Sequence, residues 1–565
     1  MSFVAQNLPA IMFGSLIFFL ITGFPVAFSL AACGFVFGWI GVELGLVPAQ
    51  FFQALPLRLY GIMANDTLLA IPFFTFMGLI LERSGMAEDL LDTAGQVFGP
   101  IRGGLAISVI LVGAMLAATT GVVAASVISM GLISLPIMMR YGYNPAVAAG
   151  SITASGTLAQ IIPPSLVLIV IADQLGRSVG DMYRAAFIPA FMLVGLYILF
   201  VVGVAILRPG WVPVLPPEAR VYREKNGDSG MQSLGILTAI TVVVGALFFV
   251  NYASLVSGFT GKDYASPTDE KVVMTLSVAI IFAFLVAVID RLLRTGLLSQ
   301  IAQRVTFVLI PPLLLVFLVL GTIFLGVATP TEGGAMGAVG ALILAIIRGR
   351  LNLALLKQAL DSTAKLSTFV LFVLIGSTVF SLTFQAIDGP KWVEHLLEAI
   401  PGGVMGFLIF VNVLIFILGF FLDFFEIAFI LLPLLAPVAD KLGIDLIFFG
   451  VMIALNLQTS FLTPPFGFAL FYLRSVAPST SYLDKVTKRR IDGISTTDIY
   501  KGSIAFVVLQ VLMVAAVLWK PEVVLSGLGE QKDPDITNIK IEIPQPDEDE
   551  EDDQPFGVPM TEDKK

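Results

Sequence analysis

The sequence has few of the residues on which soluble enzymes and secreted domains depend. Its 565 residues include one cysteine, Cys33, and one histidine, His395, and only 13% are charged. A soluble protein of this size has about 25% charged residues. One cysteine permits no disulfide within the chain, and with one histidine it cannot form a Cys/His zinc site. The composition therefore argues against a disulfide-stapled scaffold and against zinc or haem enzymes.

Two motifs are also missing. No Lys or Arg precedes Arg58, so the apolar N-terminus lacks the basic region of a cleaved signal peptide and is expected to stay as a first span. No GxxxxGK[ST] phosphate loop occurs, so we expect transport driven by an ion gradient rather than by ATP. We expect no cofactor, no enzymatic activity and no nucleic-acid partner.

Apolar residues, by contrast, are abundant. They make up 57% of the chain, and apolar runs of membrane-spanning length recur between Ile11 and Trp519. Each run of about 18 residues or more can cross roughly 30 Å of hydrocarbon. The sequence therefore predicts an all-α polytopic membrane protein in the lipid bilayer.

Basic residues mark one side of the membrane. They gather after 207, around 291–304, around 348–365 and most densely at 474–501, whereas the loops near Arg58, Lys262 and Lys391 have few. The positive-inside rule places the rich loops in the cytoplasm. Tracing the chain from these anchors predicts that both termini are periplasmic.

The two halves of the chain resemble each other at an offset of 301 residues. The matched pairs are Pro163-Pro164 with Pro464-Pro465, Pro136 with Pro437, Arg140 with Lys441, Gly142 with Gly443, and Asn144 with Asp445. The predicted orientation puts the loop after the first Pro-Pro outside and the loop after the second inside. This is an inverted-topology repeat, the layout of many secondary transporters.

Each Pro-Pro pair interrupts an apolar run, in "SGTLAQIIPPS" (155–165) and "LQTSFLTPPFG" (457–467). Proline has no N–H and cannot continue a helix, so both runs are predicted to be broken helices. Unwound backbone inside a membrane is tolerated only where protein or a water-filled cavity covers it, and its free carbonyls can bind Na⁺. A break made twice favours a binding role over a kink.

A second interruption precedes each break. "AATTGVVAAS" (117–126) and "GFFLDFFEIAF" (419–429) are predicted to form the tips of re-entrant hairpins. A charged Asp423 or Glu426 facing lipid would cost about 2.5 kcal/mol or more. Asp423 could cap a helix or help to bind a cation, and capping or packing is favoured for Glu426 and Glu332.

Four motifs in this order resemble the large membrane (M) subunit of tripartite ATP-independent periplasmic (TRAP) transporters. They are "SGTLAQIIPPS", "GVATPTEGGAMGAV" (326–339), "GFFLDFFEIAFILLPLLAP" (419–437) and "TSFLTPPFGFALF" (459–471). Within the family the chain looks most like the large permeases of the mannitol or chloroaromatic branch. Two departures are the tip "TGVV" (120–123), where many members have "SGSS", and Glu426, where many have Ala.

The resemblance implies four regions. Residues 1–210 form the first repeat, with a hairpin at 104–139 and a broken helix at 146–172; residues 211–304 are an insertion with two extra membrane helices. Residues 305–520 form the second, inverted repeat, with a hairpin at 403–439 and a broken helix at 446–473. Residues 521–565 are expected to be a disordered tail because they include the acidic run "DEDEEDD".

The resemblance also implies a Na⁺-coupled symporter of the bacterial inner membrane, an elevator-type member of the ion transporter superfamily. It imports organic carboxylates with a small membrane (Q) subunit and a periplasmic substrate-binding (P) protein. The implied cation-binding residues are Thr119, Thr120, Gly121, Ala159, Ile162 and Pro164 at one site, and Asp423, Ser460, Thr463 and Phe466 at the other. The implied substrate-binding residues are Thr157, Pro163, Thr463 and Pro465.

Two alternatives remain open at this point. One is a stand-alone ion-coupled carboxylate transporter that needs no binding protein. The other is a membrane-embedded enzyme, for which Asp423 and Glu426 are the only acid/base pair in view. Substrate identity, Na⁺ stoichiometry, oligomeric state and the role of residues 233–289 do not follow from the sequence.

Overall fold

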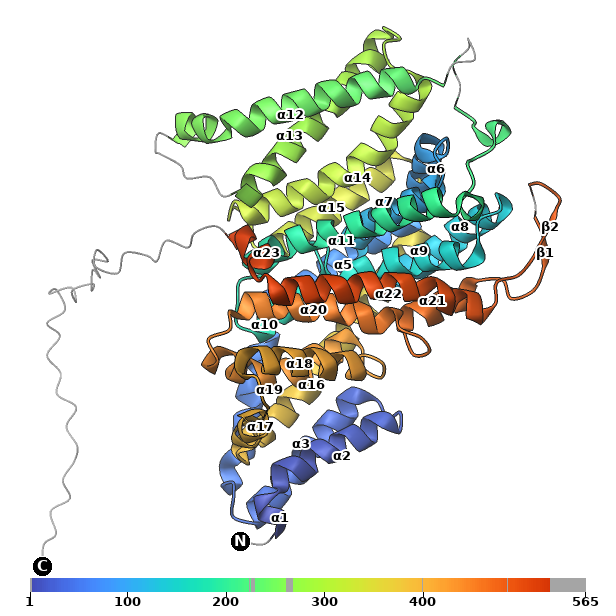
Figure 1. Cartoon of the computed structure of the whole chain (residues 1–565). Coiled ribbons are helices and arrows are strands. Elements are labelled where there is room, and N and C mark those ends of the chain that lie inside the picture. The colour runs from blue at the N-terminus through green and yellow to red at the C-terminus, as the bar shows by residue number, and fades with distance from the viewer. Residues whose placement is uncertain are drawn as a thin grey trace, which may run out of the picture. The chain divides into compact units, whose positions relative to one another are not determined.

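The computed structural model describes residues 3–222, 224, 229–260, 268–398, 400–484 and 486–528, which form one compact unit. In this part of the chain, nine helices are long and apolar enough to cross a membrane, or up to ten if a bent helix pair at 49–83 counts as one span. The prediction of an all-α polytopic membrane protein is therefore confirmed (Figure 1). The predicted acidic run at 547–553 lies outside the described residues.

The elements fall into four groups along the chain. The N-terminal group comprises α1 (Phe3–Gln6), α2 (Leu8–Ile21), α3 (Val26–Glu43), η1 (Ala49–Ala54), α4 (Leu55–Met63), η2 (Asp66–Leu69), α5 (Ala70–Arg83) and α6 (Met86–Phe98). The next comprises α7 (Gly104–Thr120), α8 (Val123–Arg140), α9 (Pro145–Thr157), η3 (Leu158–Gln160), α10 (Leu166–Gln174), α11 (Val179–Leu207), η4 (Pro209–Trp211) and η5 (Pro217–Ala219).

An insertion follows and comprises α12 (Met231–Thr260) and α13 (Thr268–Leu293). The second half begins with α14 (Gln300–Phe324), α15 (Pro330–Ile347), α16 (Leu353–Ala386) and α17 (Gly389–Glu398). It continues with α18 (Gly403–Leu418), α19 (Phe424–Lys441), α20 (Leu446–Leu462), α21 (Phe468–Val476), the two short antiparallel strands β1 (Tyr482–Leu483) and β2 (Arg490–Ile491), α22 (Thr496–Trp519), α23 (Glu522–Leu525) and η6 (Ser526–Leu528).

Small residues allow helices of the two halves to cross closely. A Cβ on Gly376 of α16 would lie 2.4 Å from the carbonyl oxygen of Ala27 on α3, and one on Gly337 of α15 would lie 2.5 Å from the sulfur of Met77 on α5. Close packing of this kind holds membrane helices together, because lipid tails give no hydrophobic drive for helix association. The pairs α3–α16 and α5–α15 thus join the two halves at positions far apart in sequence.

The insertion contains the two extra membrane helices that the sequence predicts. Residues 231–258 and 270–293 both qualify as candidate spans. α13 packs against α14, where the rings of Phe284 and Phe307 lie 5.8 Å apart and the guanidinium of Arg291 lies 5.2 Å from the Phe307 ring centre. The insertion is therefore attached to the first helix of the second half, and α12 packs mainly on α13 (Figure 1).

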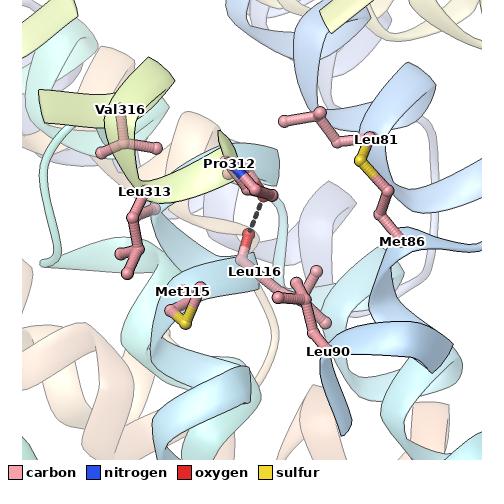
Figure 2. A pocket seen from close by; sticks show the side chains of 10 residues that line it. Leu81, Met86, Leu90, Met115, Leu116, Pro312, Leu313 and Val316 are labelled. Atoms are coloured by element: carbon pink, nitrogen blue, oxygen red, sulfur yellow. Dashed lines mark hydrogen bonds between the residues drawn. The ribbon is translucent and has the colours of Figure 1, made fainter. Parts of the chain in front are cut away.

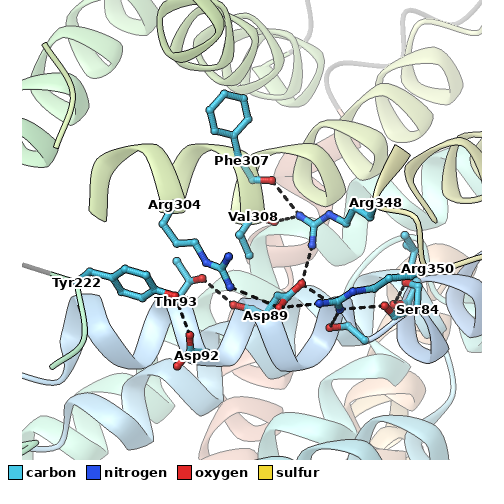
Figure 3. A network of polar contacts seen from close by, with 12 residues as sticks. Ser84, Asp89, Asp92, Thr93, Tyr222, Arg304, Phe307, Val308, Arg348 and Arg350 are labelled. Atoms are coloured by element: carbon cyan, nitrogen blue, oxygen red, sulfur yellow. Dashed lines mark hydrogen bonds and ion pairs between the residues drawn. The ribbon is translucent and has the colours of Figure 1, made fainter. Parts of the chain in front are cut away.

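An arginine cluster that the sequence did not suggest fixes α6 to the second half. The carboxylate of Asp89 accepts from Arg348 at 3.0 Å and from Arg350 at 3.2 Å, and Arg304 of α14 lies 3.5 Å away (Figure 3). Arg348 also donates to the carbonyl of Phe307 at 2.9 Å. Several charges around one carboxylate form a network, which is worth more than an isolated surface pair.

The C-terminal boundary predicted at residue 521 is too early. Residues 522–528 form α23 and η6, Val524 is fully buried, and both elements pack against α11. A Cβ on Gly527 would lie 2.6 Å from the carbonyl oxygen of Arg184, so this segment lies directly on that helix. The charge-poor sequence "PEVVLSGL" explains the difference, because its apolar residues gain by burial.

Candidate functional site

The two broken helices begin with equivalent turns and caps. Asn144 caps α9 by accepting from the N–H of Ala146 at 3.0 Å, and Asp445 caps α20 by accepting from the N–H of Phe448 at 2.8 Å. The glycines just before these caps, Gly142 and Gly443, both have positive φ, 77° and 71°. The sequence pairing of the two segments therefore corresponds to equivalent turns and caps.

The first break lies between α9 and α10 and is buried throughout. The helix tightens to η3 after Thr157, and the peptide bond between Pro163 and Pro164 is cis. Among the described residues, no hydrogen bond uses the carbonyl of Ala159, Ile162 or Pro164. A buried carbonyl without a partner is unfavourable unless a ligand or water satisfies it. The residues expected to bind a cation thus present free oxygens.

The first hairpin tip contacts this break. Gly121 ends α7 in the left-handed region with φ 61°, and a Cβ there would lie 2.9 Å from Cγ of Leu166 at the start of α10. The hydroxyls of Thr119 and Thr120 both donate to the carbonyl of Leu116 at 2.9 Å, and Thr120 also bonds Ser126 at 2.9 Å. Both hydroxyl hydrogens are therefore used within the hairpin, whereas the hydroxyl oxygens and the tip carbonyls keep lone pairs for a ligand.

The second break lies between α20 and α21 and is more open. Thr463 ends α20, its hydroxyl donates to the carbonyl of Thr459 at 2.7 Å, and the peptide bond between Pro464 and Pro465 is cis. Pro465 is exposed, and Phe466 is 46% exposed. The predicted substrate-binding residues of this break are therefore accessible, whereas Thr157 and Pro163 of the first break are buried.

The second hairpin tip covers one side of this break. A Cβ on Gly419 would lie 2.6 Å from the hydroxyl oxygen of Ser460, so the tip touches the last turns of α20. The ring of Phe466 lies 5.7 Å from that of Phe421 and 6.0 Å from that of Phe420. The structure thus places Ser460 and Phe466 next to the tip before Asp423.

The acidic residues at the second tip and at α15 cap helices. The carboxylate of Glu426 accepts from the N–H of Asp423 at 2.9 Å, in a capping box at the start of α19. Glu332 closes the same motif with Thr329 at the start of α15, where its carboxylate accepts from the Thr329 N–H at 2.8 Å. The capping roles predicted for Glu426 and Glu332 are confirmed.

The chain runs in opposite directions through the two broken helices. α9 is parallel to α22, because Gly150 packs on Gly502 near the start of both helices and Thr157 lies 3.5 Å from Gln510 further along. α20 and α21 lead to the β1–β2 hairpin, and α22 returns from it along α20 (Figure 1). Since η3 also packs against α20, the first break lies beside the antiparallel partner helix.

The buried amides around the breaks were not among the residues predicted to form the site. Gln160 and Gln458 are both fully buried, and neither the oxygen nor the nitrogen of either amide has a hydrogen-bond partner in the described part of the chain. The hydroxyl of Ser460 and the amide oxygen of Gln510 also have none there. Such groups normally have protein or water partners. Glutamine beside Pro-Pro in an apolar run was the signal that could have identified Gln160.

A small apolar cavity lies on the other side of the first tip. It is lined by Thr119 and by side chains of α5, α6, α7 and α14, including Leu81, Met115, Leu116 and Pro312 (Figure 2). Its volume is about 30 Å³. A cavity of this size can hold about one water molecule, but a water needs polar partners that this lining does not provide. The cavity therefore adds no binding group to the site.

Ion pairs secure the far ends of both hairpins. Arg140, the last residue of α8, donates from Nε and Nη2 to Asp484 at 3.0 and 2.9 Å. Hydrogen bonds from Arg140 and Thr487 hold the pKa of Asp484 well below its ordinary value. At the equivalent end of α19, Lys441 pairs with Glu394 of α17 and lowers the pKa of that carboxyl. The matched residues Arg140 and Lys441 thus have equivalent roles.

Comparison with known proteins identifies the family. The family model described as "Tripartite ATP-independent periplasmic transporter, DctM component" matches residues 13–523. A C4-dicarboxylate TRAP transporter large permease protein of Pseudomonas aeruginosa is 28% identical over 425 residues, covering 75% of this chain and 81% of the relative. A sialic acid TRAP transporter large permease protein of Vibrio cholerae is 24% identical over 461 residues, covering 78% and 89%.

One solved structure that resembles the chain is the crystal structure of the Alcanivorax borkumensis YdaH transporter. The sequence identity is 15% and the TM-score is 0.49, with 84% of this chain and 89% of that chain covered. The family match covers both hairpins, both breaks and the insertion between the halves. The chain therefore belongs to the DctM component family of the tripartite ATP-independent periplasmic (TRAP) transporters.

Proposed function

We propose that this permease couples the entry of organic carboxylates to a Na⁺ gradient. The observation that carries the proposal is the set of buried oxygens without partners at the two breaks, in particular the carbonyls of Ala159, Ile162 and Pro164. Hard cations such as Na⁺ prefer oxygen ligands, and unwound carbonyls in discontinuous helices supply them without a formal charge.

Two cation sites fit this arrangement. The first would use the carbonyls of Thr119, Thr120 and Gly121 at the tip together with those of the first break. The second would use Ser460, Thr463 and the backbone at Phe466 with the tip before Asp423. Asp423 starts α19 next to the second site, so its charge would favour a cation there.

The substrate would lie between the two breaks. The edges of the substrate site would be formed by Thr157, Pro163, Thr463 and Pro465. The unpartnered amides of Gln160 and Gln458 would provide neutral hydrogen-bond donors for a carboxylate. The relatives named for C4-dicarboxylate and for sialic acid support an acidic substrate. The accessible second break gives the route by which the substrate would reach the site.

The mechanism proposed is an elevator motion in the bacterial inner membrane, with both termini in the periplasm. The hairpins and broken helices would move as one body against the helices that join the two halves, α3 with α16 and α5 with α15. Antiparallel α9 and α20 support an inverted pair of repeats, in which the site can open to either side. A small membrane subunit and a periplasmic binding protein would complete the transporter.

Reconstituted uptake tests the function. The permease is placed in proteoliposomes with its proposed small membrane subunit and binding protein, and uptake of a ¹⁴C-labelled C4-dicarboxylate is measured under an inward Na⁺ or K⁺ gradient. Uptake under the Na⁺ gradient but not under the K⁺ gradient supports the proposal. Equal uptake under the two gradients contradicts it. Uptake that persists without the binding protein would instead identify a stand-alone carboxylate transporter.

A further inference from the structure

A pocket separate from both breaks lies between α9, α11 and α22. It has a volume of about 300 Å³ and contains the basic side chains of Arg208 and Lys501 with the ring of Trp211. Its remaining walls are apolar, from Ala146, Val147, Phe200, Val204, Leu207 and Ala505, with Gly502. No acidic residue lines it. It is therefore a positively charged recess with an apolar floor.

The two charges have no acidic partner in the described part of the chain. Arg208 ends α11, and its guanidinium lies 4.4 Å from the centre of the Trp211 ring, which holds it by a cation–π contact. The nearest acid along α22, Asp498, is oriented toward the helix start, where its carboxylate accepts from the N–H of Ser495 at 3.1 Å and from the Ser495 hydroxyl at 2.6 Å, and it forms no ion pair with Lys501. The pocket thus keeps its positive charge available.

The position of the pocket matches the surface of the inner leaflet. It lies at the end of the bundle where α11 ends and α22 begins, on the side of the basic β1–β2 hairpin (Figure 1). The positive-inside rule assigns this end to the cytoplasm, where anionic lipids concentrate. Trp211 is 39% exposed, and tryptophan is enriched at headgroup depth in membrane proteins.

The helices that form the pocket also offer a surface to an acyl chain. Leu207, which lines the pocket, is 82% exposed, and Ile504 on α22 is 54% exposed. The phosphodiester of a lipid in the recess could accept hydrogen bonds from the Arg208 guanidinium and the Lys501 ammonium. The acyl chains of the lipid would then lie along these apolar residues. We propose that this pocket binds the phosphate headgroup of an anionic phospholipid and so ties α9 to α11 and α22.

Thermal stability of the purified full chain in detergent tests the lipid site. Dioleoylphosphatidylglycerol should raise the melting temperature by several degrees more than dioleoylphosphatidylcholine does. The double variant Arg208→Gln/Lys501→Gln should lose at least half of this difference. The matched control Lys357→Gln/Arg489→Gln removes two exposed basic side chains outside the pocket and should keep the difference.

Two results would overturn the proposal. One is an undiminished difference between the two lipids in the Arg208→Gln/Lys501→Gln protein. The other is that inorganic phosphate alone stabilises the wild type as much as the anionic lipid does, which would assign the pocket to a soluble anion. If the double variant does not fold, native mass spectrometry of Lys501→Gln should still show fewer retained phosphatidylglycerol molecules than wild type, and equal retention would reject the lipid site.

Discussion

The two helix breaks have matched sequences and turns but differ in burial. Every residue from 151 to 170 is buried, whereas Thr463 and Pro464 are partly exposed and Pro465 and Phe466 are exposed. The ion pairs at the hairpin ends also differ in exposure, and the pair of the first half is again the more buried. The Asp484 and Arg140 side chains are 3% and 18% exposed, whereas those of Glu394 and Lys441 are 30% and 63% exposed.

This comparison separates local structure from environment. Caps, left-handed glycines and Pro-Pro breaks are equivalent in the two halves because the same residue types occur at matched positions. Burial depends instead on what packs around each half. The first tip is enclosed by α5, since a Cβ on Gly78 would lie 2.4 Å from Cα of Thr120, and the second tip is bordered by rings that remain partly accessible. The break in the second half is therefore the more accessible of the two.

The largest effect is expected from filling the enclosed tip. Gly121→Ala adds a Cβ at positive φ, which costs about 1–2 kcal/mol, and places it 2.9 Å from Leu166. Because the added methyl must also push the tip away from the break, we expect Na⁺-driven uptake to fall roughly tenfold or more, which corresponds to about 1.4 kcal/mol. The assay is initial uptake per folded permease in proteoliposomes.

Gly142→Ala is the matched control for this tip. Its φ of 77° brings similar backbone strain, but nothing lies within 4 Å of the added Cβ. It should keep most of the uptake. Equal loss in both variants would show that backbone strain, rather than contact between tip and break, limits transport.

The next effect concerns the unpartnered amides. Gln458→Leu removes a buried amide that bonds nothing in the described chain, so the melting temperature of the ligand-free protein should stay the same or rise. Uptake should nevertheless fall by about 2–10-fold, the effect of losing one hydrogen bond to substrate or ion. Gln160→Leu, at the enclosed first break, should have the same effects on melting temperature and uptake. A variant that unfolds readily while its uptake per folded molecule is normal would give the amide a structural role instead.

The sequence predicted these sites to the extent that local chemistry determines them. Two adjacent prolines favour a helix break but do not require one, because Pro311-Pro312 lies within the continuous helix α14. Glu426 and Glu332 follow a capping pattern, so these caps could be placed from residue types alone. The Asp89 cluster could not be predicted, because its arginines come from residues 304–350, far along the chain. The difference in burial between the breaks was also beyond the sequence, since it arises from packing between helices of different repeats.

A smaller effect is expected at the open break. Thr463→Val removes the hydroxyl that donates to the carbonyl of Thr459 and keeps the side-chain volume. If Thr463 helps to bind the second Na⁺, the Na⁺ concentration for half-maximal uptake should rise roughly threefold, since one lost ligand contact is worth about 0.5–1.5 kcal/mol. Thr238→Val is the control, because the Thr238 hydroxyl also donates to the carbonyl four residues earlier and its helix α12 packs mainly on α13 and α14. Unchanged Na⁺ dependence in Thr463→Val would remove this residue from the cation site.

The smallest effect should distinguish the two hairpin-end ion pairs. Asp484→Asn removes a carboxylate whose pKa in the folded protein lies well below the ordinary value of about 3.9. The carboxylate therefore stabilises the fold fully above about pH 4, and this stabilisation is lost as the pH falls through the folded-state pKa. The variant should melt a few degrees below wild type at pH 7, and the gap should narrow below about pH 4. Glu394→Gln removes the more exposed partner of Lys441, where solvent screens the pair, so its melting temperature should differ little from wild type. If Glu394→Gln were the more damaging change, the exposed ion pair would stabilise the protein more than the buried one, and the expectation that burial strengthens these pairs would fail.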